Sequence, residues 1–284
     1  MIQEIKIKNF LSFRDEVVFS FEASNDKFAE DCQVVTLADS AQTRLLRFAI
    51  VYGYNASGKS NLLNAFGFLT YFWDYDPSSA DLGTKIRPFR LNSSSQNEPT
   101  KFELVFFVDN TKYDYQLELN SKNVILEKLS YYKSTQPVML FERVMRNGQS
   151  EVMFNNQNGD KVTSAVKDKI TVECLKNISF FVARDKANAN LPLIDAAKIW
   201  LRKHIMNIVE PGVDLTGYAQ RKTSNDNSLV KYLLSFLQAA DFNVTNITTD
   251  VTTEKLSEDA LNFIIDHHAV PDDERERLIS EKSY

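Results

Sequence analysis

Alternation of apolar and polar residues predicts two strands at the start of the chain. Ile5 and Ile7, followed by Phe10, alternate with polar residues, which indicates an opening strand. Val17 to Phe21 predicts a second strand after a turn at Arg14 and Asp15. The polar residues 24–43 then predict a loop.

A nearly continuous apolar run and a helical repeat come next. Leu45 to Tyr52 is almost wholly apolar, which predicts a buried central strand. A glycine-bearing loop follows this run. From Ser60 onward the apolar residues recur every three or four positions, which predicts an amphipathic helix. The residues that mark this helix are Leu62, Phe66, Leu69 and Trp73.

The middle of the chain changes to a period of two after a polar loop at 74–100. Tyr113, Tyr115, Leu117 and Leu119 share one face of a strand, while polar residues share the other. Residues 102–108 are expected to pair with this strand across a turn. Further strands are predicted at 123–132, 138–145 and 150–154, with Asn147-Gly148 and Asn158-Gly159 as turn dipeptides. Together they predict an antiparallel meander.

The pattern becomes mainly helical from about residue 165. An amphipathic helix is predicted to start after Pro192, and a second helix is predicted at 228–240. We expect a polar loop at 217–227, a strand at 242–251, an acidic helix at 256–267 and a charged helix from 272 to 282. The domain hypothesis is a P-loop lobe with its meander at 1–165 and a mainly helical region at 166–284.

Composition excludes several classes of protein. Hydrophobic residues make up 43% of the 284 residues and charged residues 25%, as in a globular protein. No run approaches the roughly 18 apolar residues of a membrane span, so we expect a cytoplasmic protein without membrane contact. Cys32 and Cys174 predict two reduced, buried thiols. The histidines form a poor metal-ligand set; they are His204, His267 and His268.

Charge gives little indication of a nucleic-acid partner. The net charge is −5, and residues 251–284 carry 4 basic and 9 acidic side chains, so the first 250 residues are neutral. A basic surface over the whole chain, as nucleic-acid binding favours, is therefore not indicated. Arg221 and Lys222 are the most obvious basic pair in a predicted loop.

Two of the chain's 8 glycines, Gly53 and Gly58, lie in one loop that carries a phosphate-binding motif. Gly53 to Ser60 fits G-x-x-x-x-G-K-[ST] without a mismatch, between a predicted strand and a predicted helix. Backbone N–H groups of such a loop surround phosphate, the lysine reaches the β- and γ-phosphates, and the hydroxyl ligates Mg²⁺. The motif predicts that ATP and Mg²⁺ bind here, with Ser60 as the metal ligand. The predicted binding residues are Gly53, Tyr54, Asn55, Ala56, Ser57, Gly58, Lys59, Ser60 and Asn61.

The residues inside the motif resemble one class of P-loop protein. Asn55, together with the opening Ile-Lys-Ile-Lys-Asn-Phe-Leu-Ser-Phe, resembles the ABC-type ATPase heads of the SMC and RecF class, with Ala56 in place of a frequent glycine. The chain is more closely similar to bacterial AAA-family ATPases of the abortive-infection type, AbiL-like and RloA-like proteins. The further shared stretches are Pro88-Phe89-Arg90-Leu91, the Tyr113/Tyr115 strand and the strand from Ile125 to Leu129. The resemblance covers most of residues 1–210.

This resemblance implies a fold and several roles. The fold is an α/β, mixed α+β, P-loop NTPase: an ABC-type head lobe with a mixed sheet, the antiparallel meander and a helical region. Asn55 would contact the γ-phosphate region, and residues near Asn9 to Arg14 would lie close to adenine and ribose. The glutamine loop of such heads corresponds to Phe180 to Asn188, which contains no glutamine, so no residue is assigned to it. Heads of this class form homodimers or higher oligomers around ATP and gate an effector such as a nuclease or toxin, often in anti-phage defence.

No convincing carboxylate for ATP hydrolysis is found, and no signature loop. Leu104 to Asp109 resembles a Walker B strand, but Asn110 replaces the catalytic Glu and a turn explains Asp109 better. Phe263 to His268, which includes Asp266, is better explained as a helix end. A GTPase is disfavoured because Thr111–Asp114 and Asp214–Gly217 mimic its motifs in reversed order.

We therefore expect the catalytic half of the head to be missing from this chain. Three functions remain open: an ATPase whose hydrolysis gates a partner, a non-hydrolysing module completed by a second chain, and an AAA+ motor using Asp109.

Overall fold

The computed structural model describes residues 1–27, 30–38, 42–206, 208–210, 212–224, 226–248, 257 and 259. The chain divides into two compact units, Met1–Ile208 and Val209–Tyr284. Strands and the P-loop lie in the first unit, so the candidate site is built there. Apart from residues 257 and 259, the predicted elements at 256–267 and 272–282, with Asp266, lie outside the described residues.

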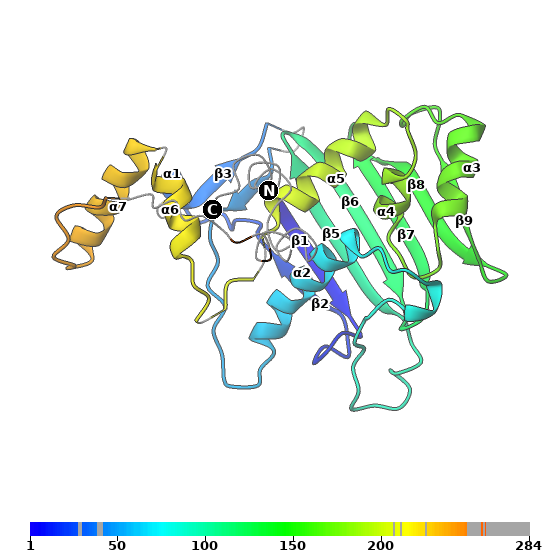
Figure 1. Ribbon diagram of the computed structural model, residues 1–284, viewed down its shortest axis with the longest axis horizontal. Helices are drawn as coiled ribbons and strands as arrows, with labels where there is room; N and C mark the ends of the chain where they lie inside the picture. Colours follow the sequence, from blue (N-terminus) through cyan, green and yellow to red (C-terminus); the bar gives the residue numbers. More distant parts are fainter. Residues whose placement is uncertain are drawn as a thin grey trace. The chain divides into compact units, whose positions relative to one another are not determined.

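A seven-stranded sheet forms the centre of the first unit, and every strand pair in it is antiparallel (Figure 1). The strand order is β2-β1-β5-β6-β7-β8-β9, so the two N-terminal strands extend the edge of the predicted meander. The mixed sheet that we expected is thus not formed by the described residues. The strands are β1 Ile2–Lys8, β2 Val17–Ser20, β5 Thr100–Val108, β6 Thr111–Leu119, β7 Val124–Tyr132, β8 Pro137–Arg146 and β9 Gln149–Phe154.

The turns of the meander lie where the sequence predicts them. Val108 pairs with Thr111, so Asp109 and Asn110 form a two-residue turn, with Asp109 at φ 51°. Asn147 and Gly148 both have positive φ, as a type I′ hairpin turn requires. These short turns fix the register of the strands and therefore the face on which each side chain lies.

The two faces of the sheet differ as the period of two predicts. On β6, Tyr113 and Tyr115 are buried, while the alternate residue Glu118 lies on the opposite face and pairs with Lys101 at 2.7 Å. The Lys6 ammonium lies 2.7 Å from Glu103 on the same open face. Helices α2 (Lys59–Asp74), α4 (Phe180–Asp185) and α5 (Pro192–His204) lie over the other face (Figure 1). The core therefore lies between the sheet and these helices.

Helix α2 buries the side that the sequence predicts. Leu62, Leu69 and Trp73 are buried, while Phe66 is partly buried and packs against the core. The Trp73 ring meets the Tyr115 ring edge to face, with centroids 5.7 Å apart. Full burial of a large aromatic side chain is worth roughly 1.5–3 kcal/mol, so these contacts hold the P-loop helix on the sheet.

A buried ion pair joins the meander to α4. Glu127 on β7 and Arg143 on β8 are both nearly inaccessible, and their closest N–O distance is 3.4 Å. Glu127 also accepts hydrogen bonds from the Tyr115 hydroxyl, the Ser179 hydroxyl and the Phe180 N–H. Burial raises the pKa of Glu127, while the Arg143 charge opposes that rise. Because Ser179 and Phe180 begin α4, the pair fixes where this helix starts.

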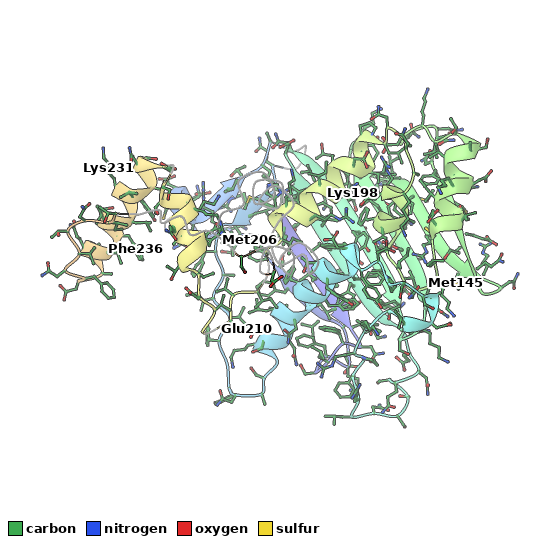
Figure 2. The ribbon with its side chains drawn as sticks, viewed as in Figure 1. Met145, Lys198, Met206, Glu210, Lys231 and Phe236 are labelled. Atoms are coloured by element: carbon green, nitrogen blue, oxygen red, sulfur yellow. The ribbon has the colours of Figure 1, made fainter. Side chains whose placement is uncertain are left out.

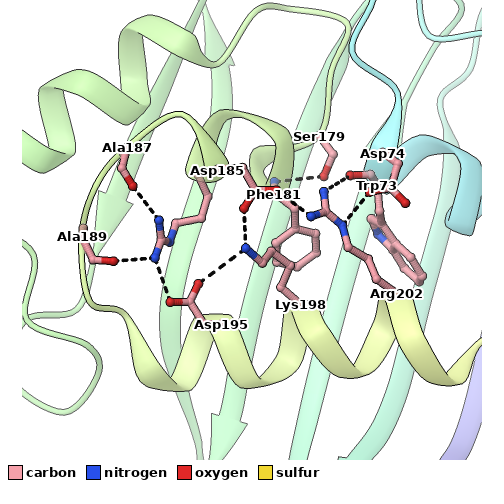
Figure 3. Close-up of polar contacts among 11 residues, drawn as sticks. Trp73, Asp74, Ser179, Phe181, Asp185, Ala187, Ala189, Asp195, Lys198 and Arg202 are labelled. Carbon is pink, nitrogen blue, oxygen red and sulfur yellow. Dashed lines mark hydrogen bonds and ion pairs between the residues drawn. The ribbon is translucent and has the colours of Figure 1, made fainter. Parts of the chain in front are cut away.

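A chain of ion pairs connects the end of α2 with α4 and α5 (Figure 3). Arg202 on α5 contacts Asp74 at 2.7 Å and donates to the Trp73 carbonyl at 2.8 Å, both at the end of α2. Arg202 also pairs with Asp185 of α4, as does Lys198. Three helices that are distant in sequence are thus fixed to one another on the covered face of the sheet.

Three sequence predictions in the first unit are corrected by the structure. Only Arg44–Leu46 (β4) of the expected buried strand forms a strand, which pairs with β3 (Val34–Thr36) in a separate two-stranded sheet. Residues 47–52 are not in a strand because none of the described strands pairs with them. The expected loop at 24–43 contains α1 (Glu30–Gln33) as well as β3. Cys32 is exposed, contrary to expectation, whereas Cys174 is buried.

The second unit contains two described helices. Helix α6 (Thr216–Ser224) replaces the expected polar loop and carries Arg221 and Lys222, and α7 (Asn227–Ala239) confirms the second predicted helix. Figure 2 shows Lys231 and Phe236 on α7. Residues 242–248 form no strand, contrary to expectation. Among the described residues, no helix has both the length and the apolar character that a membrane span needs.

Candidate nucleotide-binding site

The loop at 53–60 leads directly into α2, as the motif requires. Ala56 at φ 63° and Gly58 at φ 94° both adopt left-handed backbone conformations. Glycine tolerates this region, whereas an L-residue such as alanine pays a steric cost of roughly 1–2 kcal/mol. The loop is therefore tightly curved at two positions, and one of them is strained.

The backbone amides at the start of α2 point to an anion site. Gly58 caps the helix without a side-chain hydrogen bond, and no described residue accepts from the amides of Gly58, Lys59 or Ser60. The first N–H groups of a helix lack intrahelical partners and carry the positive end of the helix dipole. An oxyanion placed here would accept these hydrogen bonds.

The Lys59 ammonium lies inside the loop. It donates to the Gly53 and Tyr54 carbonyls, each at 2.8 Å. No carboxylate among the described residues lies within ion-pair distance of Lys59. Its charge is therefore available to a phosphate that enters the loop.

The turn after β1 forms one wall of the loop. The Asn61 side-chain amide donates to the Ser12 hydroxyl at 2.8 Å, which joins α2 to this turn. A Cβ on Gly58 would lie 3.0 Å from that hydroxyl and 3.2 Å from the Phe13 ring. The two sequence motifs singled out by the resemblance, around residues 9–14 and 53–61, are thus in contact.

Asn9 has a structural role within this turn. Its side chain is buried, accepts from the Phe89 N–H at 3.1 Å, and donates to the Ser95 and Glu98 carbonyls at 2.8 and 2.9 Å. The Thr100 hydroxyl donates to its backbone carbonyl. Asn9 therefore positions the loop that leads into β5, a role that the sequence does not reveal.

Two of the predicted ligands, Asn55 and Ser60, are exposed and accessible to a nucleotide. Sequence reasoning missed Asn64 and Arg87, which line the same cavity as Ser12, Ala56 and Asn61. The sequence signal that points to this cavity is the Pro88–Leu91 stretch, which follows Arg87 directly and lines the cavity too. No described group of three or more His, Cys, Asp or Glu side chains could hold a metal ion.

Asp109 does not lie near the P-loop. Thr100, at the start of β5, bonds to Asn9 beside the P-loop wall, and Asp109 follows the other end of that strand. Nine residues of strand span roughly 30 Å. At that end of β5 the Met1 amine donates to the Phe107 carbonyl. Burial lowers the pKa of this amine, and the charge of Asp109, which lies near it, opposes the decrease. The turn explanation of Asp109 is the one that this geometry favours.

The stretch expected to supply a glutamine loop is packed into the core. Residues Phe180 and Phe181 of α4 are fully buried, and the Phe180 ring stacks on Phe141 with centroids 3.6 Å apart. Arg184 donates to the Ala187 carbonyl at 2.8 Å and pairs with Asp195 at 2.7 Å. This segment supports the sheet, and no sensor residue is assigned to it.

Comparison with known families agrees with the motif. Residues 48–171 match the family described as "AAA domain, putative AbiEii toxin, Type IV TA system". The matched region begins in the exposed segment before the P-loop and ends within α3 (Ser164–Glu173). No curated protein matches the chain. The fold is a mixed α/β fold with a large antiparallel sheet, and the family match supports a P-loop AAA-type ATPase domain in this chain.

Proposed function

We propose that the chain binds ATP with Mg²⁺ at residues 53–61, and that binding and hydrolysis in the complete assembly gate a partner or effector. The observation that carries the proposal is the P-loop itself, where amides at the start of α2 and the Lys59 ammonium have no acceptor or carboxylate partner, respectively, among the described residues. Backbone amides and Lys59 would hold the phosphates, and Ser60 would ligate Mg²⁺. Mg²⁺ bound there would neutralise phosphate charge.

The proposed assembly follows from the resemblance to ATPase heads. Two heads would sandwich ATP, and a nuclease or toxin effector in anti-phage defence would respond to the closed state. The family match to a domain described with a toxin and a Type IV TA system supports a toxin–antitoxin context. The predicted cytoplasmic location is part of the same proposal.

A second candidate is a nucleotide-binding module that a separate chain completes. The observation that favours it is the segment before the P-loop, where Phe48, Ile50 and Tyr52 are 70%, 71% and 90% exposed. None of the described residues forms backbone hydrogen bonds with residues 48–52. An apolar run with unpaired backbone groups is a template for another strand. A partner strand here could bring the carboxylate that hydrolysis needs.

One experiment tests binding and separates these functions. Binding of a fluorescent ATP analogue and steady-state ATP hydrolysis would be measured for the chain, for Lys59→Ala and for Lys112→Ala, a lysine on β6 as control. We expect Lys59→Ala to lose binding and Lys112→Ala to keep it. Absence of binding by the unmodified chain would contradict the proposal.

Hydrolysis decides between the candidates. Turnover that appears only with the product of the neighbouring gene would support completion by a second chain. Turnover by the chain alone that is lost in both Lys59→Ala and Asp109→Ala would support an AAA+ motor instead. Sedimentation with and without ATP would test the ATP-dependent dimer, which should appear only with nucleotide.

A further inference from the structure

A cavity of about 570 Å³ opens beside the P-loop, between the turn after β1, the start of α2 and the Arg87–Leu91 stretch. Ala56 and Asn61 line it from the P-loop side, and Phe89 lines it from the opposite stretch. Sites for small molecules have volumes of roughly 300–1,000 Å³. The cavity is thus large enough for the part of a nucleotide that lies outside the phosphate loop.

The charge of this cavity is entirely positive. Arg87 and Arg90 line it, and none of the Asp or Glu residues that the structure describes does. Neither guanidinium has a hydrogen-bond or ion-pair partner among the described residues, and both residues are exposed. By contrast, six other arginines pair with carboxylates: Arg14, Arg44, Arg143, Arg146, Arg184 and Arg202. Two neighbouring arginines without a carboxylate partner favour an anionic or aromatic ligand.

The backbone that carries these arginines is held in place. The Leu11 N–H donates to the Arg87 carbonyl at 3.0 Å, and the Gln96 side chain donates to the Arg90 carbonyl at 3.2 Å. Between them, the Phe89 N–H donates to the buried Asn9 side chain. The stretch is therefore fixed on both sides of Phe89, so the positions from which the two guanidiniums reach the cavity are set before a ligand arrives.

We propose that Arg87 and Arg90 bind the nucleoside side of the nucleotide, contacting ribose and base while the P-loop holds the β- and γ-phosphates. A guanidinium stacks on an aromatic base and donates to ribose oxygens through the same planar group. This inference rests on the proposed function, because it requires phosphates in the P-loop. It assigns a role in nucleotide affinity to the Pro88–Leu91 stretch, which the sequence identifies only as a stretch shared with the family.

Two ligands separate the nucleoside contact from the phosphate contact. Dissociation constants for ATP and for inorganic tripolyphosphate, both with Mg²⁺, would be measured by calorimetry for the unmodified chain and for Arg87→Ala/Arg90→Ala. We expect ATP affinity to fall by about 10-fold or more, as for the loss of an interaction of roughly 1.4 kcal/mol. Tripolyphosphate affinity should change by less than about 3-fold, since the P-loop remains. Arg146→Ala, an exposed arginine on β8, is the control and should change neither constant.

Each outcome decides the inference. Unchanged ATP affinity in the double variant would overturn it, and an equal loss of ATP and tripolyphosphate affinity would also overturn it by showing a contact to the phosphates. Arg87→Lys/Arg90→Lys keeps the charge but loses the planar group, so it should weaken ATP binding and leave tripolyphosphate binding unaffected. If Lys59→Ala abolishes binding of both ligands while the arginine variants bind normally, this inference fails and the proposed function stands. If the unmodified chain binds neither ligand, both fail.

Discussion

A Cβ placed on Gly58 would lie 3.0 Å from the Ser12 hydroxyl, a separation that real Cβ atoms rarely show. The same glycine has φ 94°, which L-residues rarely adopt. Two independent constraints thus require glycine at the base of the phosphate loop, one from the backbone and one from the turn after β1.

Gly58→Ala should therefore abolish nucleotide binding. The new methyl group would push the loop away from Ser12 and Phe13, and the amides at the start of α2 would lose their common direction. Gly148→Ala is the matched control, because Gly148 also has positive φ but no described residue lies within 4 Å of the Cβ that alanine would add. Calorimetric titration with ATP should show binding by Gly148→Ala and none by Gly58→Ala. Equal binding by both variants would contradict the crowding argument.

Ala56→Gly should stabilise the chain by about 1 kcal/mol, because Ala56 has φ 63° and pays the left-handed steric cost that glycine avoids. Urea unfolding at neutral pH would measure the difference. The net figure of about 1 kcal/mol is the relief of a steric cost of roughly 1–2 kcal/mol less the roughly 0.4–1 kcal/mol that the larger entropy of glycine contributes to the unfolded chain. A loss of stability would show that the alanine methyl group makes contacts worth more than the strain.

Much of the first unit follows from local pattern. The period of two on Tyr113–Leu119, the helical spacing from Leu62 to Trp73 and the Asn147-Gly148 turn each predict an element that the structure confirms. In each case the pattern arises from burial on one face or from a backbone conformation that few residues tolerate. The P-loop is predicted in the same way, because phosphate binding constrains several neighbouring residues at once.

Other features could not be predicted because they depend on partners distant in sequence. The apolar run at 45–52 has the composition of a buried strand. A central strand forms only where another strand pairs with it, and the described residues contain no partner strand for residues 47–52. Helix α6 lies where the sequence predicts a loop. The sequence does not predict this helix, because its residues are mostly polar and carry no apolar repeat. The position of Asn9 depends on residues 80 or more positions away.

Asp114 should make the fold less stable as the pH rises. Burial raises the pKa of this carboxyl above its usual 3.8, with Glu103 adding to the effect. The folded state then binds the proton more tightly than the unfolded state, so the contribution of Asp114 to stability is most favourable below about pH 3.8 and is lost as the pH rises through the raised pKa. Asp114→Asn removes this titration. Its midpoint of thermal unfolding should exceed that of the unmodified chain at pH 7, and the difference should vanish near pH 3.5. A lower midpoint at pH 7 would contradict this sign.

Arg143→Met should destabilise the chain by about 3–5 kcal/mol, the usual cost of leaving one partner of a buried ion pair alone. Arg143 is almost completely buried, and besides Glu127 it donates to the Ser150 hydroxyl and to the Leu175 and Ile178 carbonyls, so four acceptors would lose a donor. Arg146→Met is the matched control on the same strand, because its pair with Glu151 is exposed and worth about 0–1 kcal/mol.

The double variant Glu127→Leu/Arg143→Met tests whether the cost comes from the uncompensated charge. Replacement of both charges should cost less than the sum of the losses in Glu127→Leu and Arg143→Met, because the double variant leaves no buried charge without its partner. Urea titration would measure the free energy of unfolding of the unmodified chain, of Glu127→Leu, of Arg143→Met and of the double variant. These four values give the coupling energy. Additive losses would show instead that Glu127 stabilises the fold mainly through Tyr115, Ser179 and the Phe180 N–H, independently of Arg143.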